Sequence, residues 1–106
     1  MAAIPERVQQ IVQEYVHKIS CQIPVKKAIL FGSYAKGTFE TDSDVDLAIF
    51  SEYFEQMDRV EGIHYLLLQA MDYGIDLEPI AFTEKEYRTP LGIVAEILDT
   101  GIEIPV

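Results

Sequence analysis

The sequence is poor in basic residues, in cysteine and in long apolar runs. Of its 106 residues, 8 are Lys or Arg and 18 are Asp or Glu, and only Lys26 and Lys27 are adjacent cations. Non-specific binding to DNA or RNA needs clustered cations, so we expect no direct contact with nucleic acid. The single cysteine, Cys21, excludes an internal disulfide, and no Cys/His pattern typical of a metal site occurs.

Targeting and membrane signals are also lacking. The first seven residues do not contain the apolar core of a signal peptide, and no apolar run approaches the roughly 18 residues that cross a bilayer. We therefore expect a cytoplasmic protein without a membrane partner. A chain of 106 residues that is 49% apolar can bury one modest core, which predicts a single domain over residues 1–106.

A short motif carries most of the chemistry that the sequence does contain. Gly32-Ser33 is followed, after ten residues, by Asp44-Val45-Asp46. Side chains two apart in a strand share a face, so Asp44 and Asp46 should project together. Two adjacent carboxylates repel each other unless a cation lies between them, and Mg²⁺ prefers carboxylate oxygens together with substrate phosphates. The motif predicts a site for a magnesium nucleotide.

The segment before the two aspartates predicts a phosphate-binding turn. Residues 27–31 are typical of a buried strand, and Gly32-Ser33 interrupts it with a residue that tolerates unusual backbone angles. A turn from a strand into a helix presents backbone N–H groups and the positive end of the helix dipole to an anion. The Ser33 hydroxyl and the Lys36 ammonium would extend this contact towards the outer phosphates.

These residues together resemble the nucleotidyltransferases related to DNA polymerase beta, and among them the small minimal nucleotidyltransferases. The similarity covers about residues 26–82. It implies a third carboxylate on a later strand, and the Ile-Asp-Leu-x-Pro run makes Asp76 the matching residue. Glu78 shares a face with Asp76 if the strand is regular, so either could reach the metal ions. We favour Asp76, because Glu78 adjoins Pro79, and proline tends to lie at a strand edge or end.

The resemblance also implies a reaction. An acceptor hydroxyl attacks the α-phosphorus of a nucleoside triphosphate, and pyrophosphate leaves. Two Mg²⁺ ions would be held by Asp44 and Asp46, with Asp76 on the ion that activates the acceptor. The Gly32-Ser33 turn and Lys36 would hold the outer phosphates in line.

Minimal nucleotidyltransferases of this kind resemble the antitoxins of two-gene toxin–antitoxin modules, which transfer AMP to a tyrosine of a helical toxin partner. We therefore expect ATP as the donor, an antitoxin role and a hetero-oligomer with such a partner. Transfer to a small molecule such as an aminoglycoside fits less well, because those relatives carry an additional helical domain. Two alternatives stay open: a binding module that neutralises its partner by contact alone through its acidic surface, and a nucleotide sensor without turnover.

The apolar spacing predicts alternating helices and strands. Helices alternating with strands indicate an α/β (α+β) fold, and the resemblance adds a mixed sheet of three or four strands packed with helices. The expected elements are a helix from Pro5 to about Ser20, a strand at 26–31, a short helix after the turn, a strand at 44–50, a helix over 54–73, a strand at 75–82, a helix from Thr89-Pro90 to Gly101 and a strand at 102–104.

The helix over 54–73 is predicted from its apolar spacing and from the glycine that follows it. Gly74 is expected to end the helix. The residues that recur at helical spacing, and so predict its apolar face, are Met57, Val60, Ile63, Leu67 and Met71.

A calcium loop is the main competing interpretation of the acidic motif. Asp42, Asp44 and Asp46 match the first three acidic positions of an EF-hand. The sixth position is Leu47 where the sharp turn requires glycine, and the twelfth is Tyr53 in place of a bidentate Glu. We therefore set calcium aside.

Three other polar or aromatic residues are candidates for a functional role. His17 and His64 lie beside the apolar faces of their predicted helices and are interpreted as surface or boundary residues. Tyr34, directly after Ser33, is a candidate for stacking on the nucleotide base, although a turn tyrosine can equally pack under the loop.

Overall fold

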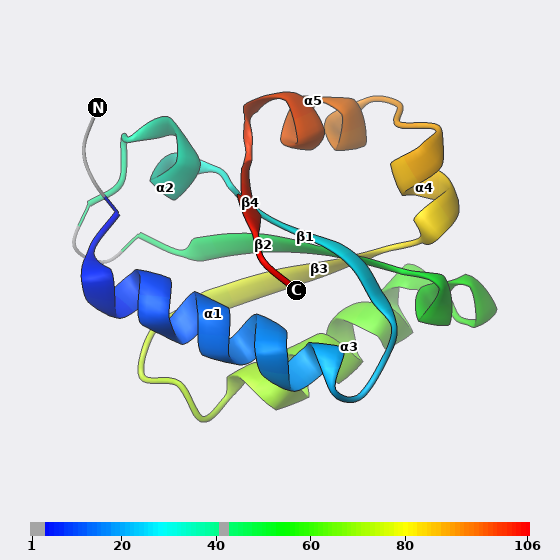
Figure 1. Cartoon of the computed structure of the whole chain (residues 1–106), viewed down its shortest axis with the longest axis horizontal. Helices are drawn as coiled ribbons and strands as arrows, with labels where there is room; N and C mark the ends of the chain where they lie inside the picture. Colours follow the sequence, from blue (N-terminus) through cyan, green and yellow to red (C-terminus); the bar gives the residue numbers. More distant parts are fainter. Residues whose placement is uncertain (1–3, 41–42) are drawn as a thin grey trace.

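The computed structural model describes residues 4–40 and 43–106, so Asp42 lies outside the described residues. Its sheet contains β1 (Val25–Phe31), β2 (Val45–Ser51), β3 (Leu77–Phe82) and β4 (Ile102–Ile104), in the order β3-β2-β1-β4 (Figure 1). β1 runs antiparallel to both β2 and β4, whereas β2 and β3 are parallel. The mixed sheet that the family resemblance implied is confirmed.

Helices cover both faces of this sheet. On one face lie α1 (Glu6–Ser20) and α3 (Arg59–Ala70), and on the other lie α4 (Glu84–Arg88) and α5 (Ile93–Thr100) (Figure 1). The short α2 (Ser33–Lys36) follows the end of β1. Across the described ranges, no helix combines the length and the apolar character needed to traverse a bilayer.

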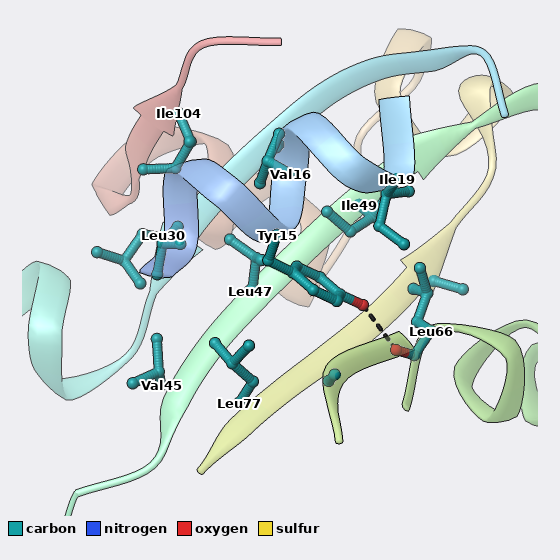
Figure 2. Close-up of a cluster of buried hydrophobic side chains, with 14 of the residues drawn as sticks. Tyr15, Val16, Ile19, Leu30, Val45, Leu47, Ile49, Leu66, Leu77 and Ile104 are labelled. Atoms are coloured by element: carbon teal, nitrogen blue, oxygen red, sulfur yellow. Dashed lines mark hydrogen bonds between the residues drawn. The ribbon is translucent and has the colours of Figure 1, made fainter. Parts of the chain in front are cut away.

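The larger core fills the space between the sheet and α1/α3. Alternation along the strands sends Leu30, Leu47 and Ile49 to this side, where they meet Tyr15 and Leu66 from the helices (Figure 2). The buried Tyr15 hydroxyl donates a hydrogen bond to the Leu66 carbonyl at 2.7 Å, which joins α1 to α3. Burial raises the pKa of Tyr15, so this hydroxyl remains a donor at physiological pH.

Helix α1 and the four strands follow the sequence-based predictions closely. α1 buries the apolar face expected of it, made by Val8, Val12, Tyr15, Val16 and Ile19. β1, β2 and β4 begin within one residue of their expected positions. β3 begins at Leu77, two residues late, because the Leu77 N–H donates to the Ile75 carbonyl at 3.0 Å in a tight turn.

The helix predicted over 54–73 is the clearest error. Glu52–Gln56 form a separate 3₁₀ helix, and Met57 is extended with φ −141°. α3 begins only after Asp58, whose side chain caps it by accepting from the Glu61 N–H at 2.8 Å. Asp58 therefore separates two helices that the apolar spacing had joined.

The predicted apolar face of that helix is only partly right, because Met57 and Ile63 pack against the core but the other three residues are exposed. α3 buries Gly62, Leu66 and Ala70 against the sheet. Gly62 is enclosed because a Cβ there would lie 2.8 Å from the Cβ of Ala81 on β3. Val60 and Met71, which were expected on the buried face, are 76% and 77% exposed.

The helix predicted from Thr89-Pro90 to Gly101 corresponds to α5, which begins later than expected, whereas α4, before it, was not predicted. α4 starts earlier at a capping box, in which the Thr83 side chain accepts from the Glu86 N–H and the Glu86 side chain accepts from the Thr83 N–H. The Thr-x-x-Glu spacing was a sequence signal for this helix. α5 begins after Gly92, whose φ is +58°, and ends at Gly101 as expected.

Candidate functional site

A glycine turn at the end of β1 forms one wall of the site. Gly32 has φ 76° and ψ −148°, a backbone conformation that favours glycine, and it precedes α2 without any side-chain cap. A Cβ on Gly32 would also overlap the carboxylate of Asp46. The absence of a side chain therefore serves both the turn and the close approach of an acid to the backbone. The first N–H groups of α2 face this position without a capping side chain, which suits an anion.

Three carboxylates converge beside this turn. In the parallel register of β2 and β3, Asp46 lies opposite Glu78. Asp44 is two residues before Asp46, directly ahead of β2. Glu78 lies near enough to Asp44 and Asp46 for the charges of both to raise its pKa. Two neighbouring strands thus bring three acids to one end of the sheet, on the face opposite α1 and α3.

The raised pKa values in this cluster show that bringing the carboxyl groups together disfavours their ionised forms. Burial, and then the charge of Asp44, raise the pKa of Asp46, while its hydrogen bond with Glu78 acts in the opposite direction. Burial raises the pKa of Glu78 as well, followed by the charges of Asp44 and Asp46. The ionised cluster is therefore disfavoured until a proton or a cation shares it.

Asp76 occupies a different place. Its carbonyl accepts a hydrogen bond from the Val45 N–H at 2.8 Å, so its backbone continues the pairing of β3 with β2. The tight turn from Ile75 to Leu77 interrupts the regular alternation at this residue. Asp76 and Tyr34 line a cavity of about 910 Å³, whose lining does not include the three clustered acids. Of the two acids that the sequence offered as the third carboxylate, the structure brings Glu78 to the aspartates.

The three acids are gathered but are not arranged around one point. No set of three His, Cys, Asp or Glu side chains within residues 4–40 and 43–106 has the geometry of a finished metal centre. The donors are nevertheless all carboxylate oxygens, with raised pKa values at Asp46 and Glu78. This donor chemistry fits Mg²⁺, which needs few protein ligands when substrate phosphates complete its shell.

The other predicted site residues surround the turn. Lys36 Nζ lies 3.7 Å from Glu96 Oε1 of α5, and both side chains are exposed. Lys36, Gly32 and Ile93 line a small cavity of about 170 Å³. Sequence reasoning did not identify Glu96 or Ile93, because α5 reaches the turn only through the tertiary fold.

Tyr34 packs under the loop. It is 5% exposed and stacks on Phe39 with ring centroids 4.5 Å apart and an interplanar angle of 9°. His17 and His64 are both exposed, in agreement with their interpretation as surface residues.

Known proteins are similar to this chain in sequence and in fold. The profile of the nucleotidyltransferase domain family matches residues 7–102. Two relatives from Methanocaldococcus jannaschii carry the name "Putative protein adenylyltransferase". One is 29% identical over 98 residues, which are 90% of this chain and 96% of the relative. The other is 30% identical over 82 residues, which are 76% of this chain and 78% of the relative.

Two solved structures share the fold. A "putative nucleotidyltransferase" from Sulfolobus solfataricus superposes with a TM-score of 0.69 at 17% identity, covering 92% of this chain and 78% of that one. A toxin–antitoxin structure with AMP-PNP gives a TM-score of 0.54 at 22% identity, covering 86% of this chain and 70% of that one. The chain belongs to the nucleotidyltransferase domain family, and it is a nucleotidyltransferase.

Proposed function

We propose that this protein transfers AMP from ATP to a hydroxyl group of a helical protein partner, in a Mg²⁺-dependent reaction, and thereby acts as an antitoxin. The observation that carries the proposal is the convergence of Asp44, Asp46 and Glu78 beside the Gly32 turn. The relatives named as protein adenylyltransferases support AMP as the transferred group and protein as the acceptor. The toxin–antitoxin structure with AMP-PNP supports the antitoxin role.

Asp44, Asp46 and Glu78 are the residues that would hold magnesium. Bound Mg²⁺ would neutralise charge on the attacking and leaving oxygens. The family spacing favours Asp76 as the third ligand, whereas the pairing of Glu78 opposite Asp46 in the β2–β3 register favours Glu78, and we adopt Glu78. Asp76 is kept as the competing assignment because it belongs to the same strand end.

The Gly32 turn and Ser33 would hold the outer phosphates and align the α-phosphorus with the acceptor. The acceptor oxygen forms a bond to the α-phosphorus, the bond from that phosphorus to the oxygen bridging the β-phosphate breaks, and pyrophosphate leaves. The acceptor proton would pass to a carboxylate of the cluster, which would act as the general base. Most of the rate enhancement then comes from positioning and charge neutralisation.

Lys36 would join the outer phosphates only by leaving Glu96. At 3.7 Å between exposed side chains, this ion pair is weak, so a triphosphate competes for the ammonium at small cost. Lys36 is therefore proposed as a phosphate contact that Glu96 holds near the turn before the nucleotide arrives.

Mass spectrometry of the partner tests the transfer reaction directly. The purified product of the adjacent gene is incubated with this protein, ATP and Mg²⁺, and we expect a mass increase equal to one AMP on a tyrosine. The Asp44→Asn/Asp46→Asn variant is the control and should give no increase. An unmodified partner with the wild-type protein would contradict the proposed transfer.

The contact-only alternative predicts a different result in cells. If Asp44→Asn/Asp46→Asn still protects cells that express the partner, contact alone neutralises it. If protection disappears while the variant still forms the complex, the transfer reaction is what neutralises the partner.

A further inference from the structure

The outer face of α3 carries apolar side chains that the described part of the chain does not cover. Val60 is 76% exposed, Leu67 43%, Leu68 52% and Met71 77%. We call these four residues the outer α3 patch. The inner face of α3 is apolar too, with Leu66 fully buried. A helix that is apolar around most of its circumference is normally buried. The fold of this chain therefore does not account for the apolar side chains on the outer face of α3.

The spacing of the patch is that of a helix–helix contact. Val60, His64, Leu67 and Met71 follow one another at steps of four, three and four residues, and Leu68 widens the stripe. Steps of three and four residues are the repeat with which one helix packs along another. The 12 residues of α3 offer about 18 Å of such a seam. This shape fits a partner helix lying along α3.

The charges beside the patch indicate which charge a partner helix should carry. Asp58, Glu61 and Asp72 are exposed around α3, and none of them forms an ion pair within residues 4–40 and 43–106. The one cation of α3, Arg59, is turned towards β3 and α4, where it pairs with Glu86 at 2.7 Å. A second copy of this chain, with its net charge of −10, would place acids against acids. Lysine or arginine flanks on a partner helix would complement this surface.

We propose that the outer α3 patch docks an amphipathic helix with basic flanks from a partner protein. α3 packs on one face of the sheet, whereas Asp46 and Glu78 lie on the other, so the docked helix leaves the carboxylates uncovered. Docking is thereby separable from the transfer reaction. It can be measured with the Asp44→Asn/Asp46→Asn variant, and its failure would leave the proposed transfer untouched.

A synthetic peptide provides the test. The probe is an amphipathic helical peptide with leucine along its seam and lysine on its flanks, and its twin carries glutamate in place of lysine. Binding to the full chain is measured by calorimetry, and the contact surface is mapped by amide chemical shifts. We expect the lysine peptide to bind, with shifts concentrated on α3, and the glutamate twin to bind at least about tenfold more weakly.

Two double variants decide where the peptide binds. Leu67→Glu/Met71→Glu adds two charges to the patch and should weaken the lysine peptide by about tenfold or more. Leu91→Glu/Ile93→Glu adds the same charges at residues that are 76% and 59% exposed around the start of α5, and should leave binding unchanged or slightly stronger. All four positions are exposed, so both variants should fold, which circular dichroism verifies.

Three outcomes would overturn the proposal. Equal loss in both double variants, or shifts scattered over the acidic surface, would mean that only net charge attracts the peptide. No binding of the lysine peptide would refute a basic helical partner. Self-association of the wild-type chain in sedimentation velocity, abolished by Leu67→Glu/Met71→Glu, would assign the patch to a second copy.

Discussion

The two faces of the sheet are built from the same strands, yet they differ in what those strands project. Towards α1 and α3, alternate residues of β1 and β2 form a continuous apolar layer that meets buried side chains from both helices. Towards α4 and α5, a smaller cluster around Phe50 covers only part of the face, and β2 and β3 begin with carboxylates. The first face mainly stabilises the fold, and the second can therefore tolerate a destabilising acid cluster.

This division has a physical basis in strand alternation. A residue shift of one along β2 exchanges the two faces, so Val45 and Asp46 are neighbours in sequence but face opposite environments. Asp46 is placed firmly because Val45 and Leu47, on either side of it, are buried in the larger core. Changes on either face should accordingly affect different measured properties.

The largest expected effect concerns the third carboxylate. Glu78→Gln should lower the rate of AMP transfer about a hundredfold or more, because it removes a ligand charge that Asp44 and Asp46 cannot replace. Asp76→Asn, the matched control on the same strand end, should retain most activity. A rate measurement under saturating Mg²⁺ and ATP compares them. If Asp76→Asn is the more damaging change, the family spacing is the better guide and Glu78 is not the ligand.

Truncating a core side chain on the face towards α1 and α3 should lower stability and leave the transfer rate unchanged. Leu66 is fully buried between α1, α3 and the sheet, so Leu66→Ala should lower the free energy of unfolding by about 2–5 kcal/mol. The transfer rate per folded molecule should remain close to that of the wild type. Urea denaturation gives the first quantity, and activity at low temperature, corrected for the folded fraction, gives the second. A selective loss of activity in a fully folded Leu66→Ala variant would contradict the division between the faces.

Alanine substitutions at two glycines with positive φ distinguish the effect of backbone strain from the effect of overlap with the site. Gly32→Ala should cost about 1–3 kcal/mol and should also abolish transfer, because its Cβ would displace the Asp46 carboxylate. Gly92 has a similar backbone conformation, with φ +58°, but a Cβ added there would lie in open space. Gly92→Ala should therefore cost about 1 kcal/mol and leave transfer intact. Equal activity of the two variants would refute the contact assigned to Gly32.

The smallest effect is expected at the capping box of α4. Burial alone would raise the pKa of Glu86, but hydrogen bonding from the Thr83 backbone N–H, followed by Arg59, outweighs it and lowers the pKa overall. A lowered pKa means that ionised Glu86 stabilises the fold above its unfolded pKa, and that this contribution is lost as the pH falls through its folded pKa. Glu86→Gln should cost about 0.5–1 kcal/mol at pH 7. The difference from wild type in thermal unfolding should disappear at acidic pH, and a constant difference would rule out the charge as its origin.

The sequence predicted the elements whose local signals agree with their packing. α1 has a strongly one-sided apolar pattern, and the Gly-Ser-x10-Asp-x-Asp motif contains both the turn and the strand alternation that place Asp44 and Asp46. α3 was misread because apolar residues lie on both of its sides, so periodicity alone could not tell which side meets the sheet. α4 was missed although its Thr-x-x-Glu capping box was visible.

The sequence by itself determined that a glycine turn precedes two same-face aspartates, because backbone geometry and strand alternation act over only a few residues. Whether Asp76 or Glu78 accompanies them depended on the register of β3 against β2 and on the tight turn that interrupts alternation at Asp76. That register arises between segments about thirty residues apart, through hydrogen bonds and packing that no local pattern specifies. The same is true of α5, whose Glu96 lies near Lys36 only because the tertiary fold brings α5 beside the turn.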